Sequence, residues 1–295
     1  MLIEKLKQKF FYQSDILSRL IWVNIIVFAL DWFFGSMLVL FEIDGIGMQI
    51  YKLLAVPSDI GTLITRPWTI FTYMFMHAGF FHLFWNMYIF YWFGEILIGV
   101  LGKKRFLPLY ILCGLAGALV YISAYNIFPL LASRGDGFMV GASAAVMGVV
   151  MGAAAIMPNV EIRLIFLGNI RLLYIALAIL LLSSIDITGS NAGGSFAHFG
   201  GAAMGYWLIK SYKEGNDKLI GFLNYWNGIT SWFYKSNTSK VKVRYRNTTL
   251  NKKSKEIDSD RQEKLDKILD KISKSGYDSL SAEEKDFLFR ISRKK

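Results

Sequence analysis

The sequence predicts an all-α membrane protein, in which a bundle of six transmembrane helices is followed by a small cytoplasmic helical hairpin. Three observations support this fold class. Hydrophobic residues make up 54% of the 295 residues, and the mean hydropathy is +0.38. Six apolar stretches are each long enough, at roughly 17 to 25 residues, to cross a bilayer as a helix. After the sixth stretch the composition becomes polar and basic, as expected of a segment outside the membrane.

The six predicted spans occupy residues 1–212, which we interpret as one membrane domain. A basic segment precedes the first span and no small-residue cleavage site follows it, so we expect an anchor and not a cleaved signal peptide. The fourth and sixth spans are rich in Gly and Ala, which lets helices approach closely in lipid. The predicted spans are residues 16–41, 82–101, 106–125, 138–157, 171–187 and 195–212.

The connection between the first two spans, residues 42–81, is too long for a simple turn. It contains Trp68, Phe71, Tyr73 and Phe75, and aromatic side chains favour the membrane–water interface. We therefore expect this loop to fold partly at the membrane surface.

Basic residues near the ends of the spans predict the orientation, because cytoplasmic loops carry an excess of Lys and Arg. With the N-terminus inside, most of these residues fall on the inner side, and so does the basic tail. The inner residues are Lys5, Lys7, Lys9, Arg19, Lys103, Lys104, Arg105, Arg163 and Arg171. The outer loops contain only Lys52, Arg66 and Arg134. Both termini are therefore predicted to be cytoplasmic.

Two further segments follow the membrane domain. Residues 213–255 begin with an aromatic and basic stretch, predicted to lie on the inner membrane surface, and continue as a polar linker. Residues 256–295 return to a helical pattern. A stop at Gly276 and a capping box at Ser281 and Glu284 predict a small helical hairpin.

Charge and cysteine content exclude several classes of protein. The net charge is +11, but residues after Leu208 contain 21 Lys and Arg against 12 Asp and Glu, so the membrane domain is nearly neutral. The charge is thus no sign of a nucleic-acid partner. The single cysteine, Cys113, allows neither an intramolecular disulfide nor a zinc site built on cysteine.

Polar side chains within the spans form three groups, and such residues are costly in lipid. Each group alone has an ordinary structural explanation, since serine often bonds a backbone carbonyl and Gly201 with Gly205 favours helix packing. Under the predicted orientation, however, His82 with Asn86, Ser143, and His198 fall in the first one or two turns of spans two, four and six, respectively. They therefore share one depth near the outer face. The groups are His77, His82 and Asn86; Gly141 to Ser143; and His198, Gly201 and Gly205.

A serine hydroxyl needs a base within hydrogen-bond reach to act as a nucleophile. Ser143 and His198 fit these roles as a candidate catalytic pair. His82 and Asn86 share one helical face and, with the backbone N–H of Ser143, are candidate donors to an oxyanion. We find no acidic residue at the same depth, so the sequence predicts a dyad without a carboxylate.

These residues resemble the motifs of the rhomboid family of intramembrane serine proteases, over roughly residues 15–212. The matching patterns are H-x-x-x-x-H-x-x-x-N from His77 to Asn86, G-x-S from Gly141 to Ser143, and A-H-x-x-G-x-x-x-G from Ala197 to Gly205. One departure is Ala144, which follows the serine where the family usually has Gly. We expect its methyl group beside the oxyanion site.

The resemblance implies a fold, an activity and a location. The fold would be the six-helix bundle of a bacterial rhomboid in the inner (plasma) membrane, with the dyad in a water-filled cavity open to the outside. The substrates would be single-span membrane proteins, cleaved in or near their transmembrane segment and reaching the site near span five. The family uses no cofactor and no metal. The resemblance leaves the physiological substrate, the role of the hairpin and the oligomeric state open.

Two other classes of function remain to be separated from a protease. A catalytically inactive relative would bind transmembrane helices without cutting them. A small transporter or channel would predict inverted repeats, which the sequence does not show. A zinc site on the three histidines lacks an accompanying carboxylate or thiolate at ligand spacing.

Overall fold

A computed structural model describes residues 16–43, 45–164, 167–233 and 252–292 of the chain. The chain divides into two compact units, Met1–Lys235 and Ser236–Lys295, and each is described here by itself. The predicted basic anchor at Lys5, Lys7 and Lys9 lies outside the described residues, as does most of the polar linker.

A helix is present at each of the six predicted spans. Three of them, α2, α6 and α7, are long and apolar enough to cross a membrane, and α9 and α10 are shorter apolar helices. The first unit is therefore helical and apolar, in agreement with the predicted fold class. The helices are α2 (Ile16–Leu40), α6 (Phe80–Leu101), α7 (Lys103–Ile127), α9 (Ser143–Ile156), α10 (Leu172–Ser183) and α11 (Ala192–Lys213).

The start of the fourth helix differs from the prediction. Residues 138–157 were predicted as one helix, but Phe138–Met139 forms strand β2, which pairs antiparallel with β1 (Val56–Pro57). Gly141 then adopts a φ of 135°, a conformation that residues with side chains rarely adopt. The chain turns there, and α9 begins at Ser143. The fifth helix is also shorter than predicted, because it ends at Ser183 in a turn-rich segment.

Helix α11 packs against α9 and α7 at the centre of the unit. A Cβ atom at Gly201 would overlap the carbonyl of Ala144, and one at Gly205 would overlap the carbonyl of Gly148. Only glycine therefore permits the backbones of α9 and α11 to approach this closely. The packing role expected for Gly201 and Gly205 is confirmed.

The loop between α2 and α6 is folded against the bundle. It contains α3 (Ile46–Leu54), β1, α4 (Ile60–Thr65), α5 (Thr69–Thr72) and the 3₁₀ helix η2 (Tyr73–Phe75). The hydroxyl group of Tyr73 is buried and donates a hydrogen bond of 2.6 Å to the carbonyl of Gly114 on α7. Trp68, in contrast, is 47% exposed. The aromatic residues of this loop therefore divide between the core and the surface.

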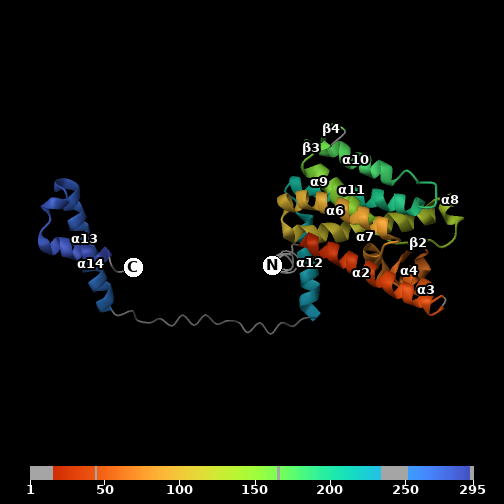
Figure 1. The fold of residues 1–295 in the computed structure, drawn as a ribbon, viewed down its shortest axis with the longest axis horizontal. Helices are drawn as coiled ribbons and strands as arrows, with labels where there is room; N and C mark the ends of the chain where they lie inside the picture. The colour runs from red at the N-terminus through yellow and green to blue at the C-terminus, as the bar shows by residue number, and fades with distance from the viewer. Residues whose placement is uncertain (1–15, 44, 165–166, 234–251, 293–295) are drawn as a thin grey trace. The chain divides into compact units, whose positions relative to one another are not determined.

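Figure 1 shows α6, α7, α9 and α11 running side by side, with α10 on one side of them and α2 with the loop helices on the other. The short helix α8 (Pro129–Ala132) follows α7. Strands β3 (Glu161–Leu164) and β4 (Gly168–Arg171) form an antiparallel hairpin before α10. Helix α12 (Lys218–Phe233) follows α11 and runs across the direction of α7 (Figure 1).

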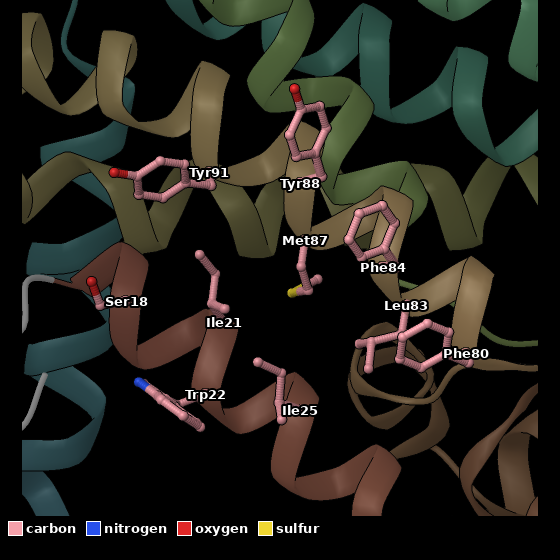
Figure 2. Close-up of a pocket in the computed structure, with 10 residues that line it drawn as sticks. All are labelled: Ser18, Ile21, Trp22, Ile25, Phe80, Leu83, Phe84, Met87, Tyr88 and Tyr91. Atoms are coloured by element: carbon pink, nitrogen blue, oxygen red, sulfur yellow. The ribbon is translucent and has the colours of Figure 1, made fainter. Parts of the chain in front are cut away.

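Between α2 and α6 lies an apolar groove of about 510 Å³ (Figure 2). Figure 2 shows Phe80, Phe84, Tyr88 and Tyr91 along α6, with the hydroxyl group of Tyr88 directed away from α2, and Ile25 of α2 on the opposite wall. The ring of Phe84 stacks on the rings of Phe80 and Tyr88, with centroid distances of 6.3 Å and 6.1 Å, respectively. This wall of the groove is thus a ladder of aromatic rings at helical spacing.

The second unit contains α13 (Lys252–Ser275), η3 (Tyr277–Ser279) and α14 (Ala282–Ser292). Helix α13 ends before Gly276, which has a φ of 78°. The predicted capping box is confirmed: Glu284 accepts from the Ser281 N–H at 2.7 Å, and the Ser281 hydroxyl accepts from the Glu284 N–H at 3.3 Å. Lys271 reaches across from α13 to form an ion pair of 2.9 Å with Glu284.

Candidate active site

The side chains of Ser143 and His198 meet at the centre of the first unit. Ser143 is the first residue of α9, and His198 lies in the second turn of α11. Nε2 of His198 is 2.8 Å from Oγ of Ser143, and the histidine side chain is buried. The close packing of α9 on α11 at Gly201 brings these two turns together. The structure thus places the two predicted catalytic residues within hydrogen-bond distance.

The other ring nitrogen of His198 contacts the backbone. Nδ1 lies 3.1 Å from the carbonyl oxygen of Ser183, the last residue of α10. A carbonyl can only accept, so Nδ1 carries the proton and Nε2 is free to accept from the Ser143 hydroxyl. Sequence reasoning missed this partner, because a backbone carbonyl leaves no signal in the choice of residue. Asp186 does not fill this role and instead accepts from the Asn191 N–H at 2.8 Å.

Gly141 lies between Ser143 and His82. A Cβ atom at Gly141 would lie 2.9 Å from Cε1 of His82 and 3.4 Å from Oγ of Ser143. Both side chains therefore border the same point, and together with the φ of 135° they explain why glycine is needed there. The N–H of Gly141 donates to the carbonyl of Tyr73 at 3.0 Å, which ties this turn to the folded loop.

Asn86 and His77 lie on either side of His82 along the chain. Asn86 is buried, and its side-chain amide donates to the His82 carbonyl at 2.8 Å, so it folds back on its own helix. The rings of His77 and His82 lie edge to face at 5.2 Å. Neither ring nitrogen of His77 has a hydrogen-bond partner among the described residues. Within those residues, His82 and Ser143 border the same point, whereas Asn86 forms no hydrogen bond with the serine.

Comparison with known protein families agrees with this geometry. The Rhomboid domain matches residues 65–213, about half of the chain, and this match includes every residue of the site. The chain belongs to the rhomboid family. The match begins within the loop before α6 and ends at the last residue of α11. Residues 247–294 match a family of unknown function, DUF6576. This match includes α13, η3 and α14 of the second unit.

Curated relatives of this rhomboid chain carry the name presenilin-associated rhomboid-like protein, mitochondrial. The Danio rerio protein A is 30% identical over 139 residues, and the Bos taurus and Homo sapiens proteins are 29% and 28% identical over 147 residues. Each alignment spans 46% of this chain and 35% of the relative. The shared part is thus about a third of the relatives' length. With the long apolar helices, the rhomboid domain makes this chain an integral multi-pass membrane protein.

The departure at Ala144 has a structural explanation. Its side chain is buried, and its methyl group meets the position of Gly117 on α7. The structure thus shows the methyl group packed toward α7, and its place beside the oxyanion site stays a prediction. Helix α9 rotates by about 100° between successive residues, which turns Ala144 toward α7. Because residue 117 is a glycine, there is room for the methyl group of Ala144.

A cavity of about 320 Å³ borders the site on the side of His82. Its walls include Tyr51, Tyr121, Tyr125 and Asn191. They combine aromatic rings with polar groups, which distinguishes this cavity from the apolar groove between α2 and α6. Among the described residues, no group of three or more His, Cys, Asp or Glu side chains is arranged to hold a metal ion.

Proposed function

We propose that this rhomboid protein is an intramembrane serine endopeptidase that cleaves single-span membrane proteins within or near their transmembrane segment. The observation that carries the proposal is the 2.8 Å contact between Ser143 Oγ and His198 Nε2, with Nδ1 of the same ring on a carbonyl. This arrangement supplies a nucleophile, a base and an orienting acceptor without a carboxylate.

Each step of the reaction has a residue suited to it. His198 Nε2 takes the hydroxyl proton as Ser143 Oγ forms a bond to the scissile carbonyl carbon. The carbonyl then becomes an oxyanion. When the C–N bond breaks, His198 returns the proton to the leaving amine, and an acyl group remains on Ser143. Water activated by His198 hydrolyses this ester and restores the serine.

Donors for the oxyanion come from two helices. The N–H of Ser143 is at the start of α9, where backbone N–H groups have no partner within the helix and the dipole is positive. His82 borders the same point as the serine hydroxyl. We assign Asn86 to the same group, because its amide has a second N–H beyond the one that donates to the His82 carbonyl.

A cavity between α6 and α10 supports the route that we propose for the substrate. An apolar cavity of about 640 Å³ separates α6 from α10 and includes Tyr88, Trp92 and Ile179. We propose that a substrate helix reaches the dyad between these two helices, while the polar cavity at His82 admits water from the outer side. The lipid bilayer is the other partner, and we assign no nucleic acid.

We further propose that all six helices cross a bacterial plasma membrane with both termini in the cytoplasm. The distribution of Lys and Arg along the sequence supports this topology. A reporter fused after Lys213 should register as cytoplasmic, and one in the loop around Arg134 as external. An external signal after Lys213 would show that the topology is wrong.

Labelling of the purified protein in detergent with a serine-directed fluorophosphonate tests the activity. We expect modification of Ser143, no modification in Ser143→Ala, and loss of modification in His198→Ala. Cleavage of a single-span reporter protein by the same preparations completes the test. A wild-type protein that neither reacts nor cleaves would instead support the catalytically inactive relative that binds transmembrane helices.

A further inference from the structure

Another apolar groove runs between α7 and α12, outside the candidate active site. Its volume is about 310 Å³. Helix α12 contributes one wall, where the rings of Phe222 and Trp226 stack with their centroids 6.4 Å apart. The complete lining is Phe71 of α5, Leu107, Pro108 and Ile111 of α7, and Phe222, Leu223 and Trp226 of α12.

Polar contacts hold α12 in place and so define this groove. Arg105 of α7 forms an ion pair of 2.6 Å with Asp217, the residue before α12. The other carboxylate oxygen of Asp217 accepts from the Ile220 N–H at 3.1 Å, which caps the start of α12. Leu219 is fully buried in the core. The groove is therefore a fixed feature of the first unit.

The start of α7 carries an excess of positive charge. Lys103, Lys104 and Arg105 are its first three residues, and its first turn contains no acidic residue. Cations are disfavoured there, because the N-terminal end of a helix dipole is itself positive. Asp217 offsets Arg105 alone. Lys103 and Lys104 are exposed, and neither has a hydrogen bond or ion pair with any described residue.

Helical spacing places these two lysines at one end of the groove. Lys103 precedes Leu107 by four residues and Lys104 precedes Pro108 by four, so each pair shares a face of α7 about 6 Å apart. Side chains on a helix lean toward its N-terminus, and lysine keeps its ammonium group in the polar layer. The two charges therefore lie beyond the apolar end of the groove that Leu107 lines.

We propose that this groove binds one acyl chain of an anionic phospholipid, whose phosphate lies against Lys103 and Lys104. The proposal rests on the placement of α7 across the membrane with its first turn at the surface. It does not depend on proteolysis. The anionic headgroup supplies the negative charge that the first turn of α7 lacks, and the chain fills the apolar lining as far as Phe71.

The larger groove of Figure 2 does not carry the same inference. Neither groove has a charged residue in its described lining. Two consecutive lysines lie one turn from the groove between α7 and α12, whereas the groove of Figure 2, lined by apolar and aromatic side chains with Ser18, has no such pair among the described residues. It therefore offers nothing that would distinguish one lipid from another. This difference makes it a useful control for the groove between α7 and α12.

Thermal unfolding of the full chain in detergent, titrated with phosphatidylglycerol or phosphatidylcholine, tests the proposal. We expect phosphatidylglycerol to raise the unfolding temperature of the wild type at lower lipid concentration than phosphatidylcholine. The double variant Lys103→Gln, Lys104→Gln should weaken the apparent affinity for phosphatidylglycerol roughly 10- to 30-fold, since each lysine near an anionic membrane surface contributes roughly fivefold in affinity. Leu107→Trp, which fills the groove, should weaken the effect of both lipids.

Matched controls distinguish lipid binding in this groove from non-specific effects of removing positive charge or of adding side-chain volume. Arg163→Gln with Arg171→Gln removes two charges from the β3–β4 hairpin and should leave the lipid effect unchanged. Ile25→Trp fills the groove of Figure 2 and should also leave the lipid effect unchanged. Equal stabilisation of the wild type by the two lipids, or equal losses in the two charge variants, would overturn the proposal.

Two further results would also contradict it. Soluble glycerol 3-phosphate that stabilised the protein as well as phosphatidylglycerol would show that the acyl chain is not bound. A dimer in native mass spectrometry that Leu107→Trp dissociates would show that a second copy of the chain occupies the groove. Neither result depends on whether the protein cleaves a substrate.

Discussion

His198 and Ser143 lie 55 positions apart in the sequence, yet Nε2 of one is 2.8 Å from Oγ of the other. The proposed mechanism requires both groups, because a hydroxyl without its base and a base without its nucleophile are equally inert. We predict that Ser143→Ala and His198→Ala each reduce cleavage of a single-span substrate to background, and that the double variant is no worse. Near-normal cleavage by His198→Ala would exclude His198 as the general base and make His82 the next candidate for that role.

Ser183 should matter through its backbone and not through its side chain. Its carbonyl accepts from His198 Nδ1, whereas its hydroxyl donates to the Leu180 carbonyl at 2.8 Å. We therefore predict that Ser183→Ala retains the kcat and KM of the wild type in the reporter assay. A large fall in kcat with an unchanged unfolding temperature would show that the hydroxyl itself takes part in the site.

The sequence predicts the six helices well because long apolar runs leave few alternatives in a membrane. It does not predict the start of α9, since the pairing of Val56 with Met139 joins residues that are far apart in the chain. The direction of Ala144 depends on the rotation of α9 against α7, which only packing determines. The residue types of the site are readable from the sequence, but the carbonyl of Ser183 is not, and the catalytic roles stay a proposal.

Asn86 should contribute to the rate without being essential. An oxyanion donor typically contributes on the order of 10²- to 10³-fold, and the N–H of Ser143 and the ring of His82 remain in its absence. We predict that Asn86→Ala lowers kcat by about this factor at most and leaves cleavage measurable above that of Ser143→Ala. Cys113→Ala, at a buried position outside the site, is the control. Complete loss in a folded Asn86→Ala protein would contradict a graded role.

The cap of α14 should respond to acid. The Lys271 ammonium beside Glu284 and the N–H of Ser281 hold the pKa of Glu284 below its usual range. A carboxylate with a lowered folded-state pKa stabilises the fold above its unfolded pKa of about 4.3, and this contribution disappears as the pH falls through the lower value. Hydrogen exchange at α14, corrected for intrinsic rates, should lose protection below about pH 4 in the wild type.

Glu284→Gln provides the comparison for this acid response. Its α14 amides should be less protected at neutral pH and should show no further loss through the same pH range. An identical pH profile in the two proteins would mean that Glu284 does not stabilise the cap.

The glycines between α9 and α11 should be needed for the geometry of the dyad. A methyl group at position 205 would meet the carbonyl of Gly148, and backbone atoms cannot move aside as a flexible side chain can. We predict that Gly205→Ala separates the two helices, destabilises the protein by about 1–3 kcal/mol, and lowers cleavage because Ser143 and His198 no longer meet.

Gly99→Ala on α6 is the matched control, since a Cβ there meets nothing within 4 Å. Replacing an exposed helical glycine should stabilise α6 by roughly 0.5–1 kcal/mol and leave cleavage unchanged. Unfolding in detergent and the reporter assay measure both effects. A Gly205→Ala protein as stable and active as Gly99→Ala would show that α9 and α11 accommodate the added methyl group without loss of stability or cleavage.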